Sequence, residues 1–192
     1  MPTPVAHALA GVAVCLQASP RIARAPREIS SVLALGVFVA IACLPDVDFI
    51  LGFIAGVNLH HHFTHSVGAT VLVAGISGML GYLLNLRSGS AARFAWWVGI
   101  AYGSHMALDL FSKDTSPPYG MELLWPLSDR FIDGPWDLFD DIWRGSFAKL
   151  LGLHNWLAVA REIALVAPLV ALSLWVSKRR ARVTHSPEEK IG

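Results

Sequence analysis

Charged residues are scarce in this chain of 192 residues. Asp, Glu, Lys and Arg together make up 15% of the sequence, whereas hydrophobic residues make up 54% and the mean hydropathy is +0.52. Soluble domains usually carry about 25% charged residues. The composition therefore argues against an ordinary soluble domain and predicts an integral membrane protein in contact with the lipid bilayer.

The chain also lacks excess basic charge and paired cysteines. Its formal net charge is only +1, whereas nucleic-acid-binding domains carry a basic face or stripe. The two cysteines, Cys15 and Cys43, lie in apolar runs, where a thiol behaves as a small hydrophobic group. We therefore expect no nucleic-acid partner and no disulfide framework.

Long apolar runs dominate the sequence instead. Five segments approach the length of about 20 residues that a helix needs to cross a bilayer. They cover residues 2–18, 28–50, 65–86, 94–112 and 160–177. The first is short and the second is interrupted at Pro45, so a re-entrant or interfacial helix is the alternative for these two. We predict an all-α, multi-pass transmembrane helical bundle of about five spans, with one domain over residues 1–178 and a basic, flexible cytoplasmic tail over residues 179–192.

The basic residues predict the orientation of this bundle, because short cytoplasmic loops carry an excess of Lys and Arg. Residues 19–27, residues 87–93 and the tail are rich in Arg and Lys. Residues 45–64 contain neither, and residues 113–159 contain four against seven acidic residues. We expect the N-terminus outside and the C-terminus in the cytoplasm.

Seven ionisable side chains then fall near the outer ends of separate apolar segments. They are His7, Asp46, Asp48, His60, His65, His105 and Asp109. Such groups are costly near hydrocarbon unless they are paired, hydrated or bound to something, so their convergence predicts a functional site. For any one of them alone, the alternative is a structural polar group.

The number of candidate ligands favours more than one metal ion. A single zinc ion takes four ligands, three from the protein at a catalytic site. Mixed imidazole and carboxylate ligands suit Zn, with Mn or Fe as alternatives, so we expect two or three divalent ions. Paired metals stabilise both the attacking and the leaving oxygen of a displacement, which favours hydrolysis of a phosphoric ester.

Asp46 and Asp48 are the candidates for a general base toward metal-bound water. The alternatives are a metal-binding or metal-transport protein without catalysis, and a purely structural cluster.

The run His60-His61-His62-Phe63-Thr64-His65-Ser66 leaves its own ligands open. His61 and His65 share a helical face if the following helix begins early, whereas His60 fits if residues 60–63 form a loop. Thr64 or Ser66 is the expected cap of that helix.

Residues 130–153 carry aromatic and leucine side chains at near-helical spacing, with charged residues between them. This pattern predicts an amphipathic interfacial helix on the outer leaflet. Its role is either to pack over the site as a lid or to guide a lipid-like substrate into it.

Several short motifs occur in a particular order: His7-Ala8-Leu9-Ala10-Gly11, Leu44-Pro45-Asp46-Val47-Asp48, residues 60–66, Ser104-His105 with Asp109, and Leu123-Leu124-Trp125-Pro126-Leu127. Over residues 5–130 the chain resembles the LexA-regulated, membrane-bound, metal-dependent hydrolases of the YdjM type. The resemblance implies a multi-pass protein of the bacterial inner membrane with hydrolase activity. More distantly, the motifs resemble the zinc phospholipase C and P1 nuclease group, which implies a trinuclear zinc site and a phosphoric ester substrate.

This chain departs from the family pattern at one position. The family pattern reads His-Arg before Thr-His-Ser, and alignment on Thr64 puts His60 at the histidine and His61 at the arginine. The resemblance thus favours His60 as the metal ligand and implies that His61 contacts the substrate. A neutral imidazole cannot reproduce the bidentate bonds of a guanidinium group, so either His61 is a weak substitute or the substrate differs.

Overall fold

The computed structural model describes residues 2–22, 31–84, 88–115 and 117–184. Within these ranges the regular structure is helical, which confirms the all-α prediction. The elements are α1 (Pro4–Ile22), α2 (Ser31–Cys43), α3 (Val47–Ala55), the 3₁₀ turn η1 (Phe63–His65), α4 (Val67–Leu83), α5 (Ser88–Asp109), α6 (Phe147–Leu150) and α7 (Leu153–Thr184).

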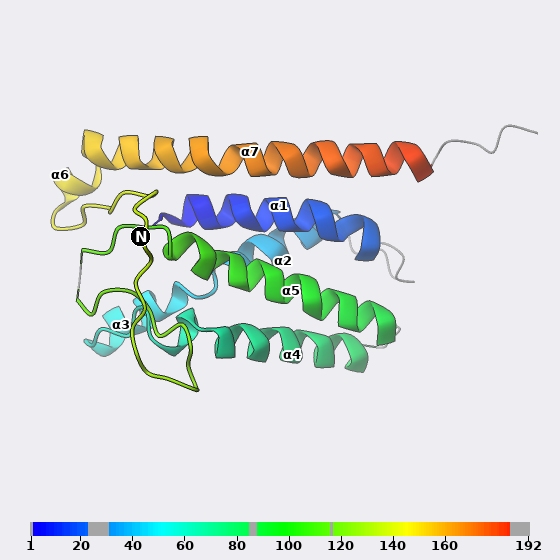
Figure 1. Cartoon of the computed structure of the whole chain (residues 1–192), viewed down its shortest axis with the longest axis horizontal. Helices are drawn as coiled ribbons and strands as arrows, with labels where there is room; N and C mark the ends of the chain where they lie inside the picture. The colour runs from blue at the N-terminus through cyan, green and yellow to red at the C-terminus, as the bar shows by residue number, and fades with distance from the viewer. Residues whose placement is uncertain (1, 23–30, 85–87, 116, 185–192) are drawn as a thin grey trace, which may run out of the picture.

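The long helices α1, α4, α5 and α7 run side by side, with the irregular segments gathered at one end of the bundle (Figure 1). Helix α1 packs against α2, α5 and α7, and α5 also packs against α2 and α4. A Cβ atom on Gly11 would lie 2.8 Å from the carbonyl oxygen of Phe38. Glycine therefore allows α1 and α2 to approach closely, as small residues do between membrane helices.

The outer surfaces of the bundle are apolar. Val32 on α2, Leu72 on α4 and Leu169 on α7 are all more than half exposed. Exposed apolar faces of this extent are typical of surfaces that contact lipid or another protein.

Fewer helices than predicted meet the requirements for crossing a membrane. Among the described residues, the segment Phe147–Val183, which covers α6 and all but the last residue of α7, is long and apolar enough by itself. Helices α2 and α3 meet the requirements only together and are bent by 53° at their junction, while Pro4–Ala18 of α1 and Val67–Leu83 of α4 are apolar but shorter. Length and composition therefore give one or two spans, and the five-span count stays a prediction.

The predicted second span is broken where proline interrupts it. Helix α2 ends at Cys43 and α3 begins at Val47, so residues 28–50 do not form one continuous helix. Pro45 lies in the intervening turn, since it cannot donate a helical backbone hydrogen bond. The break places Asp46 at the N-cap of α3 and Asp48 in its first turn.

The predicted amphipathic helix over residues 130–153 is wrong for most of its length. Apart from the short helix α6, this stretch is irregular up to Gly152, and α7 begins only at Leu153. Phe139 pairs its backbone with Phe111 and Lys113 instead of forming helical bonds. Pro135 cannot donate such a bond, and the Asp141 side chain caps the next backbone amide. Apolar spacing alone could not reveal these competing contacts.

The first part of the predicted flexible tail is helical. Helix α7 continues to Thr184 and so includes residues 179–184, whereas residues 185–192 lie outside the described part of the chain.

Candidate metal centre

The structure brings the seven predicted side chains together. The elements that carry them meet at the end of the bundle where the irregular segments gather (Figure 1). Helix α1 supplies His7, the α2–α3 turn supplies Asp46, and α3 supplies Asp48. The loop before η1 supplies His60, and η1 itself supplies His65. The last turns of α5 supply His105 and Asp109. His7, His65 and His105 are completely buried.

Five of these residues form what we call the inner group: His7, Asp46, His65, His105 and Asp109. His105 lies at its centre. Its Nε2 atom is 3.1 Å from Oδ2 of Asp109, 3.5 Å from Oδ1 of Asp46 and 3.2 Å from Nε2 of His65. The His7 ring stacks on the His105 ring with 3.6 Å between centroids.

A backbone contact fixes the orientation of His105. Its Nδ1 atom donates a hydrogen bond of 2.8 Å to the carbonyl oxygen of Ala42 in α2. A histidine that donates through one ring nitrogen presents the other as a metal ligand. The contact therefore directs the Nε2 lone pair of His105 into the inner group.

Asp48 lies between His60 and His65. Its Oδ1 is 2.9 Å from Nδ1 of His60, and its Oδ2 is 3.0 Å from Nδ1 of His65 and accepts a hydrogen bond from the Thr64 hydroxyl. Tyr102 in turn donates to the Thr64 carbonyl over 2.7 Å. Sequence reasoning missed the roles of Thr64 and Tyr102. Tyr102 precedes His105 by three residues, so the two side chains share one face of the helix. This spacing could have indicated that Tyr102 lies near the site.

Burial controls the protonation of His65 in η1. It lowers the pKa of His65 below the ordinary 6.5 and outweighs the opposing attraction of Asp48 and Asp109. The ring is thus neutral at pH 7, and the neutral form of imidazole is the one that binds metals.

Six buried side-chain atoms of the site have no hydrogen-bond partner in the described structure. They are both ring nitrogens of His7, Oδ1 of Asp46, Nε2 of His61 and both carboxylate oxygens of Asp109. Buried polar groups are normally satisfied, and an unsatisfied one calls for an explanation such as an ion. The buried His and Asp groups therefore fit a metal ion, which would supply the missing partner.

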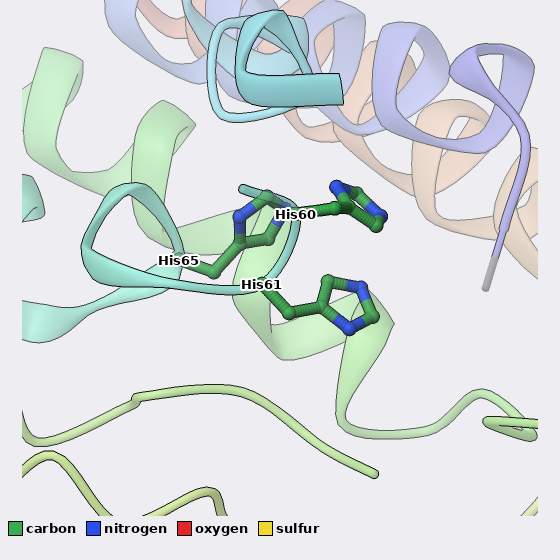
Figure 2. Close-up of side chains that lie close together, drawn as sticks. All are labelled: His60, His61 and His65. Carbon is green, nitrogen blue, oxygen red and sulfur yellow. The ribbon is translucent and has the colours of Figure 1, made fainter. Parts of the chain in front are cut away.

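A second set of possible ligands, the outer group, consists of His60, His61 and His65 (Figure 2). His65 belongs to both groups. The rings of His60 and His61 lie 4.0 Å apart between centroids, and each is 5.0 Å from the His65 ring. His61 was expected to contact substrate, yet its geometry also suits a metal ligand.

A cavity of about 210 Å³ lies beside the outer group. Its lining comprises Phe49, Asn58, His60, His61, Asp114, Pro118, Asp141 and Arg144. Four of these come from the irregular residues 113–146, whose long-range placement no sequence period could have revealed. None of His7, Asp46, His65, His105 and Asp109 is among the residues that line this cavity. The cavity therefore borders His60 and His61 of the outer group and not the inner group.

The third histidine of the run, His62, is directed elsewhere. Its Nδ1 atom is 2.7 Å from Oε1 of Glu122, and its ring lies almost perpendicular to the Phe131 ring, with 5.2 Å between centroids. Ser66, rather than Thr64, caps α4 by accepting a hydrogen bond from the backbone amide of Ala69.

The comparison with protein families decides the membrane assignment. Residues 1–184 match the YdjM inner membrane protein family. The chain belongs to this family. It is therefore an inner membrane protein, as the resemblance and the composition predicted. Searches of curated proteins and of solved structures gave no match. The more distant likeness to zinc phospholipase C and P1 nuclease is not supported.

Proposed function

We propose that this protein is a membrane-bound metal-dependent hydrolase of phosphoric esters, with a phospholipid or an envelope metabolite as substrate. The observation that carries the proposal is the set of buried, unpartnered ligand atoms in a site built from five histidines and three carboxylates. A purely structural cluster would pair these atoms with one another, because unsatisfied buried polar groups cost stability.

The donor set suits two or three divalent ions, with zinc as the first candidate and manganese or iron as alternatives. Bound metal would lower the pKa of a coordinated water and polarise a phosphoryl oxygen. Asp46 is the better candidate for accepting a proton from such a water, because its Oδ1 has no hydrogen-bond partner within the described residues. Asp48 is already engaged by His60, His65 and Thr64, so its role is to orient them.

One cationic side chain in the cavity, beside the carboxylates of Asp114 and Asp141, supports a phosphoric ester rather than a neutral one. Arg144 is the cationic side chain among the described residues lining the cavity, and it lies on the side chain of Phe49, 5.3 Å from the ring centroid. Guanidinium groups bind phosphate through paired, charge-assisted hydrogen bonds. Arg144 thus supplies, from another part of the chain, the kind of charge that His61 does not provide.

We propose further that the site faces the extracytoplasmic side, within a bundle of about five spans. The basic residues Arg93, Arg179 and Arg180 lie toward the end of the bundle opposite the metal centre, as the positions of α5 and α7 indicate (Figure 1). Lys and Arg favour the cytoplasmic side. A C-terminal green fluorescent protein fusion should then fluoresce, whereas a C-terminal alkaline phosphatase fusion should be inactive; the opposite pair of results would reverse the orientation.

The activity is tested with the full chain purified in detergent. Release of p-nitrophenol is followed from a phosphate monoester, a phosphate diester and an acetate ester, and phospholipid vesicles are assayed in parallel for released phosphate or diacylglycerol. We expect turnover of a phosphoric ester that a chelator abolishes and added metal restores. Asp46→Asn should abolish it, and Asp140→Asn, at a surface ion pair with Arg161, should not. Absence of phosphoric ester turnover by metal-replete protein would contradict the proposal.

A further inference from the structure

The outer group has an unusual backbone at its centre. His61 has a φ of +67°, and it is the non-glycine residue with positive φ in the described parts of the chain. A left-handed conformation costs stability for a residue with a Cβ atom, and strained residues of this kind cluster at functional sites. The His61 carbonyl accepts a hydrogen bond from the backbone amide of Glu122, which holds this conformation in place.

This conformation directs the His61 ring toward the rings of His60 and His65, as Figure 2 shows. His61 is only 8% exposed, and its Nε2 atom is buried with no hydrogen-bond partner among the described residues. A side chain that served only to contact a substrate would have no reason to bury this nitrogen beside two other histidines. A strained backbone and an unpartnered ring nitrogen are both accounted for if Nε2 binds an ion.

A carboxylate lies on the other side of the ring. Oδ2 of Asp114 is 3.6 Å from Nδ1 of His61 and also accepts a hydrogen bond from the backbone amide of Gly120. Metal-bound histidines commonly have a carboxylate near their second nitrogen, which orients the ring and raises its basicity. Asp114 is therefore placed to orient the His61 ring as a metal ligand.

We propose that His60 and His61 hold a metal position separate from the inner group, to which Nε2 of His65 belongs, that His61 is a ligand there, and that this position faces the cavity. Two protein ligands leave coordination sites open for water and substrate. The cavity borders His60 and His61 and carries Arg144 on its lining, so this ion is the one that a substrate phosphoryl group would meet. The proposal rests on the proposed function in that both require bound metal.

The proposal is tested by zinc binding to the full chain in detergent. The protein is stripped with a chelator and reconstituted, bound zinc is counted by elemental analysis, and affinity is measured by competition with a chromophoric chelator. His61→Asn is the decisive variant, because asparagine tolerates positive φ. His62→Gln is the matched control, since His62 lies next in the chain but contacts Glu122.

We expect His61→Asn to lose one zinc ion per chain, or to bind one ion at least tenfold more weakly, while His62→Gln binds as the unmodified protein does. Asp114→Asn should keep the number of ions and weaken one of them about tenfold, which is the lower end of the effect of such outer carboxylates. Equal number and affinity in His61→Asn and His62→Gln would overturn the proposal. So would loss of every ion in a folded His61→Asn protein.

The two proposals fail in different ways. If Asp109→Asn lowers zinc binding while His61→Asn does not, only the separate outer position is wrong. If the unmodified protein binds no zinc, manganese or iron, the proposed function fails as well.

Discussion

The Nδ1 atom of His105 donates a hydrogen bond of 2.8 Å to the carbonyl oxygen of Ala42. This contact joins the C-terminal end of α5 to the last turn of α2, next to the break that carries Asp46. It also turns Nε2 of His105 toward Asp46 and Asp109. The break between α2 and α3 therefore places Asp46 beside His105 of α5.

Replacing Asp109 by asparagine should lower metal affinity at least about 100-fold. The substitution keeps the shape of a completely buried side chain but removes its charge, beside His7 and His105. Binding is measured by competition with a chromophoric chelator. Asp140→Asn is the control, because Asp140 pairs with Arg161 at the surface. Similar affinity in the two variants would count against the inner group as a ligand set.

Removing the metal should destabilise the protein. Ligand at about 1,000 times its Kd stabilises the native state by about 4 kcal/mol. For a chain of this size, that corresponds to a fall in Tm of about 10 °C on chelation. Thermal unfolding in detergent, followed by intrinsic tryptophan fluorescence, measures the change, and added zinc should reverse it. A Tm that does not respond to either treatment would favour a structural cluster.

Arg144→Gln should raise KM for a phosphoric ester about tenfold and change kcat little. A tenfold change corresponds to about 1.4 kcal/mol, a modest value for a charged hydrogen bond at an exposed residue. Arg130→Gln is the matched control, because Arg130 is also exposed but does not line the cavity. Steady-state kinetics over a range of substrate concentrations separates the two parameters. Equal KM in both variants would remove Arg144 from substrate recognition.

Gly68→Ala should displace the segment around Trp125 from the start of α4. A Cβ atom on Gly68 would lie 2.4 Å from the carbonyl oxygen of Trp125, and the Gly68 amide donates to that same oxygen. We expect a fall in Tm of several degrees, since overpacking costs about 1–3 kcal/mol. Gly75→Ala, in the same helix, has open space around the new methyl group and should leave the Tm almost unchanged.

The parts of the site that could be predicted from sequence are those with local rules. His105 and Asp109 are four residues apart in a helix, so their proximity followed from helical geometry. Pro45 signalled the break that frees Asp46, since proline cannot continue a helix.

Other parts depended on contacts between distant segments. The aromatic spacing of residues 130–153 matched that of an amphipathic helix. Instead, the backbone of Phe139 forms hydrogen bonds with Phe111 and Lys113, and the segment is irregular. Arg144 reaches the cavity only through that segment, and Asp114 reaches it from the irregular residues that follow α5. The ligand among His60, His61 and His62 stayed open because no local sequence rule predicts the positive φ at His61.

The central claim is that the buried cluster holds metal, and elemental analysis of the detergent-purified protein tests it most directly. The unmodified protein is compared with Asp46→Ala and His105→Ala, each checked for folding by size-exclusion chromatography. We predict two or three divalent ions per chain in the unmodified protein and a loss of at least one in each variant. Absence of stoichiometric metal from the unmodified protein, after reconstitution with zinc, manganese or iron, would contradict the account.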